Sequence, residues 1–486
     1  MSRIVGQRCG RTSLAGVAVL PLLLAAVATV SPAQVPSPTL EGPVTGGGGK
    51  PIIGTTSFDL AEVGYMQEEF FISGTATAYT SADPLTSDGN WSVTAASTAP
   101  YKTRILVYRP AQTARFRGTV VVEWLNISAG ADLAVDWIHT HTEMVRSGIT
   151  WVGVSAQALG VVGGTAAAGG IKNADPARYG SLDHPGDSFS FDIFSQAGQA
   201  IRAPSGTDPL GGLKVKRVLA IGDSQSASRL TTYIDGVDPL ARIYDGFLVH
   251  SRAGGASSLS QSPLPQIDSP SPTLIREDVQ VPVLVFETET DLIGYFAARQ
   301  PDTDHIRLWE VAGTSHADTY TVSVGFGDLG NDPAVANLVV ATFGCGLPIN
   351  SGPHHFVLNA ALKALNRWVK RGKPPAEAPR VEVLPGSPPS IARDALGNAL
   401  GGIRTPQLDV PIATLSGVGQ SGPGFCRLYG TMAPFDAATL ASLYPDHHAY
   451  VSAYVKATRQ AVRGRYLVRR DAKLLKANAR ESAIPN

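Results

Sequence analysis

Short apolar runs recur through the middle of the chain, each long enough for one buried strand. They occupy residues 118–124, 149–154, 217–221, 246–249, 282–286 and 306–311. Continuous apolar runs, as opposed to alternating ones, are typical of parallel strands that are covered on both faces. Helix-compatible stretches separate or follow them, at residues 135–147, 225–234 and 353–371. Strands that alternate with helices predict an α/β protein with a mostly parallel central sheet flanked by helices.

The pattern changes before this predicted core. Residues 69–76 and 103–108 alternate apolar and polar side chains, which predicts antiparallel strands at the start of the sheet. Residues 34–50 are rich in Pro, Gly and Ser and end in a run of four glycines. That composition predicts a flexible leader.

Two later segments lack a regular pattern. Residues 251–280 lie between two predicted core strands and are rich in Ser, Pro and Gly, so a lid over the site and a plain surface loop are both open interpretations. Residues 376–436 are Pro- and Gly-rich, and the tail from residue 446 is helical in character. We therefore expect a core over residues 51–372 and a C-terminal extension over residues 373–486 that packs on it.

The first 33 residues have the three parts of a signal peptide. Arg3, Arg8 and Arg11 make a basic start without acidic residues, and a mostly apolar stretch follows from residue 14 to residue 30. Ser31 and Ala33 are small residues at the positions that a signal peptidase reads. We predict export to the periplasm or the extracellular space without a stable membrane anchor; an uncleaved anchor is the alternative.

Composition favours a folded and nearly neutral protein. Of the 486 residues 43% are hydrophobic, enough for a sizeable core, and 40 basic residues balance 40 acidic ones. A chain without excess positive charge is not expected to bind nucleic acid. Nothing in the composition indicates an oligomeric state.

Two cysteines remain once the predicted signal peptide is removed. In an oxidising compartment Cys345 and Cys426 are expected to form a disulfide; two free buried thiols are the alternative. Because neither has a neighbouring cysteine or histidine at a ligand spacing, the pair makes a poor zinc site. We expect no metal and no organic cofactor.

The sequence Gly222-Asp223-Ser224-Gln225-Ser226 joins a predicted strand to a predicted helix. A serine at such a sharp turn is typical of a nucleophile elbow, which exposes the hydroxyl. The usual pattern ends in glycine, where strand and helix pack closely, and Ser226 replaces it here. The alternative is an ordinary turn in which Ser224 caps the helix.

Two further segments supply a base and an acid. His316 follows the last predicted strand in a Gly- and Ser-containing loop, and the carboxylates of Glu287, Glu289 and Asp291 follow or end the strand before it. Serine needs a base to take its proton, and the base needs a carboxylate to orient it. Asp291 is the first choice, nine positions after Pro282, with Glu289 as the alternative acid. The order serine, acid, histidine is that of α/β-hydrolases.

An oxyanion site is expected beside Ser224. The first amides of a helix lack intrahelical partners, so the backbone amide of Gln225 can face a developing negative charge. A second amide is expected from the loop after the strand that ends at residue 124, from Leu125 or Asn126.

Over most of its mature length the chain resembles a group of exported bacterial and fungal proteins described only as an "alpha/beta hydrolase domain" family. The segments that carry the resemblance are Val122-Glu123-Trp124-Leu125-Asn126, Arg178-Tyr179-Gly180-Ser181-Leu182, His184-Pro185-Gly186-Asp187, Asp192-Ile193-Phe194-Ser195-Gln196, Gly222-Asp223-Ser224-Gln225-Ser226, Thr288-Glu289-Thr290-Asp291 and the run from Gly397 to Pro406. The resemblance implies the α/β-hydrolase fold and carboxylic ester hydrolysis. It leaves open whether the Tyr179 and His184 region and Arg404 line a pocket or serve packing.

These observations predict a secreted serine hydrolase that acts on a small-molecule or lipid-like ester through an acyl-enzyme. An acyltransferase or a peptidase could use the same three residues. A binding protein that kept the fold without catalysis is the alternative from another class.

Overall fold

The computed structural model describes residues 1–7, 10, 35–164, 169–323 and 343–485. The chain divides into two units, residues 1–32 and 33–486, and the fold described below is that of the second unit. Most of the predicted signal peptide lies outside the described residues. None of the helices that the structure describes is both long enough and apolar enough to cross a bilayer.

A ten-stranded sheet forms the centre of the second unit, in the order β10-β9-β8-β7-β4-β5-β3-β2-β1-β6. Neighbouring strands from β10 to β5 are parallel, whereas β5, β3, β2 and β1 pair antiparallel. The strands are β1 (Thr39–Glu41), β2 (Tyr65–Thr80), β3 (Thr94–Pro110), β4 (Thr119–Trp124), β5 (Thr150–Val154), β6 (Ser205–Gly206), β7 (Arg217–Asp223), β8 (Gly246–His250), β9 (Val283–Thr288) and β10 (Ile306–Val311). The predicted fold class, a mostly parallel sheet flanked by helices, is confirmed.

Helices and short turns connect and follow these strands. The α-helices are α1 (Val135–Ser147), α2 (Ala158–Val162), α3 (Gly170–Ala174), α4 (Pro176–Tyr179), α5 (Ser190–Arg202), α6 (Gln225–Thr232), α7 (Asp238–Ala241), α8 (Glu289–Tyr295), α9 (Thr319–Ser323), α11 (His354–Arg371), α12 (Pro406–Asp409), α13 (Ala437–Leu443), α14 (His447–Gly464) and α15 (Arg469–Glu481). Shorter helical turns are η1 (Leu60–Val63), η2 (Thr113–Arg115), η3 (Asp187–Phe189), η4 (Tyr233–Val237), η5 (Phe296–Ala298) and η7 (Cys426–Leu428).

Alternate side chains of the central strands enter two different hydrophobic cores. In β7, Val218 and Ala220 face the core that includes residues of α5, α6 and α8, whereas Leu219 and Ile221 face the core that includes residues of α1 and α11. A strand covered on both faces needs apolar residues at successive positions. This explains the continuous apolar runs that dominate the sequence.

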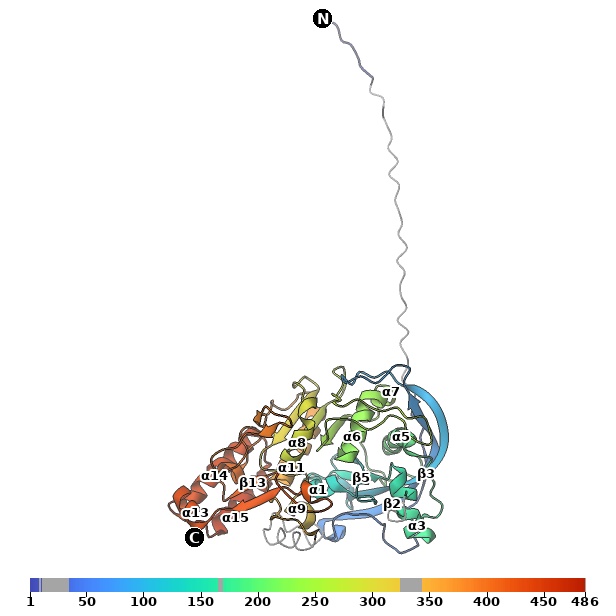
Figure 1. Cartoon of the computed structure of the whole chain (residues 1–486). Helices are drawn as coiled ribbons and strands as arrows, with labels where there is room; N and C mark the ends of the chain where they lie inside the picture. Colours follow the sequence, from blue (N-terminus) through green and yellow to red (C-terminus); the bar gives the residue numbers. More distant parts are fainter. Residues whose placement is uncertain (8–9, 11–34, 165–168, 324–342, 486) are drawn as a thin grey trace. The chain divides into compact units, whose positions relative to one another are not determined.

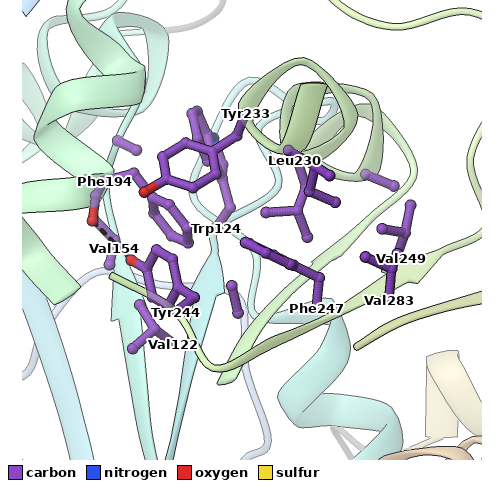
Figure 2. Packing of buried hydrophobic residues seen from close by; sticks show 14 of the residues in the cluster. Val122, Trp124, Val154, Phe194, Leu230, Tyr233, Tyr244, Phe247, Val249 and Val283 are labelled. Carbon is purple, nitrogen blue, oxygen red and sulfur yellow. Dashed lines mark hydrogen bonds between the residues drawn. The ribbon is translucent and has the colours of Figure 1, made fainter. Parts of the chain in front are cut away.

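The first of these cores holds helix α6 against the sheet. Figure 2 shows Leu230 of α6, Tyr233 of η4 and Phe194 of α5 packed against Phe247 and other sheet residues. The buried tyrosine hydroxyls are also satisfied, since Tyr244 donates to the Phe194 carbonyl at 2.7 Å and Tyr233 lies 2.9 Å from Ser195 Oγ. The N-terminus of α6, directly after β7, is therefore fixed on the sheet.

The C-terminal extension packs on the β10 end of the sheet. Ile403 forms a parallel bridge with Val311, and the ring of Tyr466 lies 5.3 Å from that of Trp309 in β10. Two small hairpins, β11 (Val383–Leu384) with β12 (Ser390–Ile391) and β13 (Ala413–Ser416) with β14 (Thr431–Pro434), occupy the segment expected to be mostly irregular. In Figure 1 the helices α14 and α15, in orange and red, lie far from the long β2–β3 hairpin in blue.

Two expectations about segments can be compared with the structure. The leader over residues 34–50 is not flexible throughout, because β1 pairs with β2, with Leu40 opposite Ile72, and both Val35 and Leu40 are buried. Without β1 the backbone of β2 would be an open sheet edge. Cys345 and Cys426 form the expected disulfide, with 5.4 Å between their Cα atoms.

The segment over residues 251–280 lies beside α6. Its Ser257 amide donates to the Ser228 carbonyl at 3.1 Å, and Leu259 and Ile275 are buried in the core. A lid function for this segment stays a prediction.

Candidate active site

Ser224 occupies a strained turn between β7 and α6. Its φ of 59° lies in the left-handed region, which residues with a side chain adopt rarely and at a cost of about 1–3 kcal/mol. Hydrogen bonds fix the turn on both sides, from the Ser224 amide to the His250 carbonyl at 2.9 Å and from the Ser228 amide to the Ser224 carbonyl at 3.1 Å. The half-buried Ser224 side chain makes no capping hydrogen bond to α6. The geometry therefore fits a nucleophile at a strand-to-helix turn better than a helix cap.

Strand and helix approach closely at this turn. A Cβ added at Gly222 would lie 3.0 Å from the Ser226 carbonyl oxygen, closer than side chains normally come to backbone. Ser226 is fully buried, and its Oγ has no hydrogen-bond partner among the described residues. Position 226 thus accommodates serine in place of the usual glycine, whereas position 222 needs glycine.

His316 and Asp291 come together at the carboxyl edge of the sheet. His316 follows β10, Asp291 lies in the first turn of α8 after β9, and His316 Nδ1 lies 2.6 Å from Asp291 Oδ1. The Thr288 hydroxyl donates to the other oxygen of Asp291, and the His316 amide donates to Thr290 Oγ1 at 3.1 Å. An imidazole that faces a carboxylate through Nδ1 carries its proton there, which leaves Nε2 available to accept one.

The charges around His316 make it a strong base. Burial alone would lower its pKa, but the Asp291 carboxylate and then Asp223 raise the pKa of His316 to about 9, against a smaller opposing effect of Arg427. Only about a tenth of each side chain in the His316–Asp291 pair is exposed, so water screens their interaction little. The arrangement stabilises the imidazolium that forms when a serine gives up its proton.

Glu289, the alternative acid, does not face His316. Its fully buried carboxylate accepts hydrogen bonds from the Gly313 amide, from the Gly417 amide at 3.1 Å and from Arg393 Nη2 at 3.0 Å. Residues that are two positions apart in an α-helix are rotated by about 200° around its axis, so Glu289 and Asp291 point to opposite sides of α8. Glu289 thereby joins α8 to the His316 loop and to the C-terminal extension. Glu287 is buried within β9.

Neither amide expected in the loop after β4 is free. The Leu125 amide donates to the Val154 carbonyl at 3.2 Å and the Asn126 amide to the Leu133 carbonyl at 3.0 Å, so the structure contradicts this part of the expected oxyanion site. Instead, Asn126 Nδ2 donates to the Asp223 carbonyl at 3.1 Å, which supports the serine turn. The Gln225 amide remains in place as the first amide of α6.

Other residues singled out in the sequence make polar contacts within the fold. The Tyr179 hydroxyl joins a buried ion-pair network in which Arg104 binds Glu69 and Asp132, each at 2.8 Å. His184 Nε2 lies 2.9 Å from the Ala156 carbonyl. Arg404 hydrogen-bonds the Ala399 and Leu408 carbonyls and pairs with Asp409. These contacts assign none of the three to a pocket.

Sequence reasoning missed a group of buried residues behind the serine turn. His250, the last residue of β8, lies 2.8 Å from Asp136 Oδ1 through Nδ1 and 2.7 Å from His354 Nε2 through Nε2. Three distant segments supply these residues, so no local pattern announces the group. Within the described ranges, no cluster of three or more His, Cys, Asp or Glu residues is arranged to hold a metal ion.

A serine in a strained strand-to-helix turn, with a histidine and an acid from later strands of a mostly parallel sheet, defines the α/β-hydrolase class. The chain belongs to the alpha/beta hydrolase domain family, whose family model matches residues 40–477. No curated protein matches the chain. Among solved structures, it is similar to fungal esterases from Rhizomucor miehei, with 12% identity, 65% of this chain and 92% of that chain covered, and a TM-score of 0.31.

Two further solved structures show a comparable likeness. One is XC6422 from Xanthomonas campestris, described as an α/β serine hydrolase without a lid, with 13% identity, 56% of this chain and 94% of that chain covered, and a TM-score of 0.29. The other is a glucuronoyl esterase from Solibacter usitatus, with 12% identity, 58% of this chain and 82% of that chain covered, and a TM-score of 0.29.

Proposed function

We propose that the protein is an exported serine hydrolase that cleaves carboxylic esters through an acyl-enzyme. The observation that carries the proposal is the contact between His316 Nδ1 and Asp291 at the sheet edge where the strained turn holds Ser224. Asp223, the residue before the serine, acts on the pKa of His316, which relates the base to the serine turn.

In the first half of the reaction, Ser224 Oγ attacks the ester carbonyl carbon while its proton passes to His316 Nε2. The amide of Gln225 faces the carbonyl oxygen, which becomes negative as the tetrahedral intermediate forms. The bond to the alcohol oxygen then breaks, and His316 returns the proton to the departing alcohol. The Asp291 carboxylate stabilises the imidazolium in between.

In the second half, water takes the place of the alcohol. His316 accepts a proton from the water as its oxygen attacks the acyl carbon, and the bond to Ser224 Oγ breaks as His316 returns a proton to the serine. The products are the carboxylic acid and the restored enzyme. No step uses a metal or an organic cofactor.

Turnover of a series of p-nitrophenyl esters by the purified mature protein tests the proposal. We expect hydrolysis that is lost in Ser224→Ala and in His316→Ala. It should persist in Ser226→Ala, which removes a neighbouring buried hydroxyl that has no hydrogen-bond partner in the described part of the chain. Added alcohols that divert the acyl group would indicate an acyltransferase, and casein cleavage without ester cleavage would indicate a peptidase. Wild-type protein that is folded and hydrolyses no ester in the series would overturn the proposal.

A further inference from the structure

Two helices near the C-terminus concentrate the positive charge of the chain. Residues 447–481, which form α14, the turn after it and α15, contain nine basic and two acidic residues. The rest of the chain contains 31 basic and 38 acidic residues. A chain without net charge therefore combines one strongly cationic segment with a negatively charged remainder.

The basic side chains of α14 lie on the face that is turned away from the fold. The buried residues of this helix recur at the spacing of one helical face and include Tyr450, Tyr454, Ala457 and Ala461. The exposed Lys456, Arg459 and Arg463 each lie two positions from one of them, which is about 200° around the helix axis. No acidic residue occurs within α14.

Helix α15 also presents a basic face to solvent. The spacing i, i+4, i+7, i+11 of a single helical face joins four of its basic residues, Arg469, Lys473, Lys476 and Arg480. All but the half-buried Lys476 are exposed. The acidic Asp471 lies on the buried side, where it accepts hydrogen bonds from Arg146 of α1 at 2.9 Å and from Asn359 of α11 at 3.1 Å. The one acid of this helix that could neutralise the basic face from within is thus used to hold α15 on the fold.

The positive charges of the two helices have no counter-charges. We call their basic residues the C-terminal basic surface: Lys456, Arg459, Arg463, Arg465, Arg469, Arg470, Lys473, Lys476 and Arg480. Within the ranges that the structure describes, none of these nine side chains makes an ion pair or a hydrogen bond, in contrast to the neighbouring Arg146 and Lys363, which pair with acids. Gathered like charges without partners attract an anionic ligand from solution.

The dimensions of this surface favour a broad partner. Helices α14 and α15 contact each other along the end of the chain (Figure 1). With 18 and 13 residues, they are about 27 and 20 Å long. Leu474, which is 51% exposed, stands beside Lys473 on α15. A bilayer offers anionic headgroups to both helices at once and a boundary that a leucine can enter, whereas a linear polyanion follows a single row of charges.

We propose that the C-terminal basic surface docks the protein reversibly on a bilayer that contains anionic phospholipids. The cations contact lipid phosphates, and Leu474 enters the headgroup region. The contact involves exposed charges, so salt screens it. The inference goes beyond the proposed function and does not depend on it, because docking requires no ester cleavage.

Cosedimentation with lipid vesicles tests the proposal. Purified mature protein is mixed with vesicles of phosphatidylcholine alone or of phosphatidylcholine with phosphatidylglycerol, and the partition coefficient is measured at about 0.15 M and about 1 M NaCl. We expect binding to the anionic vesicles only, and its loss at the higher salt concentration. The triple variant Lys456→Gln, Arg463→Gln, Lys473→Gln is expected to bind about a hundredfold more weakly, at about fivefold for each charge near the lipid surface.

A matched variant removes the same residue types elsewhere. Arg117, Lys214 and Lys216 are exposed basic residues beside the starts of β4 and β7, and their replacement by Gln is expected to leave the partition coefficient unchanged. Circular dichroism confirms that both triple variants are folded. Wild-type protein that does not bind anionic vesicles, or equal losses in the two triple variants, would overturn the inference. So would binding to the soluble polyanion dextran sulfate without binding to the vesicles.

Discussion

Replacing the two candidate acids one at a time separates them by their effects on rate and stability. Asp291→Asn removes the charge that touches His316, whereas Glu289→Gln removes a charge on the other side of α8. Both changes conserve side-chain size. The structure predicts a loss of rate from the first and a loss of stability from the second.

The size of the rate effect follows from the pKa of His316. The net rise of this pKa from 6.5 to about 9, to which Asp291 contributes most and Asp223 less, is worth about 3.4 kcal/mol of imidazolium stabilisation at 1.36 kcal/mol per unit, which corresponds to a rate factor on the order of 300. Asp291→Asn also lowers the pKa of His316, so the base of the variant is deprotonated at a lower pH than that of the wild type. The two proteins are therefore compared by the limiting value of kcat/KM on the alkaline plateau. We expect that limiting value to fall about 300-fold in Asp291→Asn.

Glu289→Gln is expected to keep the limiting kcat/KM within about tenfold of wild type. It weakens hydrogen bonds from Arg393 and two buried amides, at a cost of about 1–3 kcal/mol in the free energy of unfolding. Ester hydrolysis against pH gives the rates, and denaturant unfolding gives the stabilities. A larger rate loss in folded Glu289→Gln than in folded Asp291→Asn would refute the assignment.

Three further predictions concern pH, the disulfide and the turn. The acid limb of kcat/KM against pH is expected near pH 9, because His316 must lose its proton to act as base and its pKa is raised to about 9; a midpoint at or below 6.5 would contradict the pairing. Cys345→Ser is expected to lower the free energy of unfolding by up to about 4 kcal/mol, since the disulfide closes a loop of 81 residues. In denaturant unfolding, reduced wild-type protein should show the same loss of free energy of unfolding. Gly222→Ala is expected to lower the free energy of unfolding by about 1–3 kcal/mol and to reduce kcat/KM, because the added Cβ would press on the Ser226 carbonyl and displace α6. Thermal melting followed by circular dichroism measures the stability, and ester turnover measures the activity. A variant with wild-type stability and full activity would count against the close packing.

Elements whose burial follows a regular pattern were predictable from the sequence. The strand at Ile306–Val311 and the helix at Val135–Ser147 have the bounds that their patterns indicate, because burial on both faces or on one helical stripe determines residue type at every position. Strand β1 was missed because its three residues gain their order from pairing with β2 and not from a pattern of their own.

The candidate site was predictable only where its chemistry has a local signature. Ser224 stands in a turn with recognisable neighbours, and His316 follows a clear strand. The choice between Asp291 and Glu289 depended on which side of α8 each faces, which a short acidic run does not reveal. The Leu125 amide bonds the Val154 carbonyl of β5 and the Asn126 amide bonds the Leu133 carbonyl within the same loop, and no local sequence pattern indicates either contact. His250 and its partners are joined only by the tertiary fold.

The central claim is that Ser224 is an activated nucleophile, and covalent labelling tests it most directly. Purified mature protein is treated with a fluorophosphonate, and the modified peptide is identified by mass spectrometry, with Ser224→Ala and His316→Ala alongside. We expect one label on Ser224 in the wild type, none in Ser224→Ala and greatly slowed labelling in His316→Ala. A folded wild-type protein that stays unlabelled, or a label carried by another serine, would contradict the account.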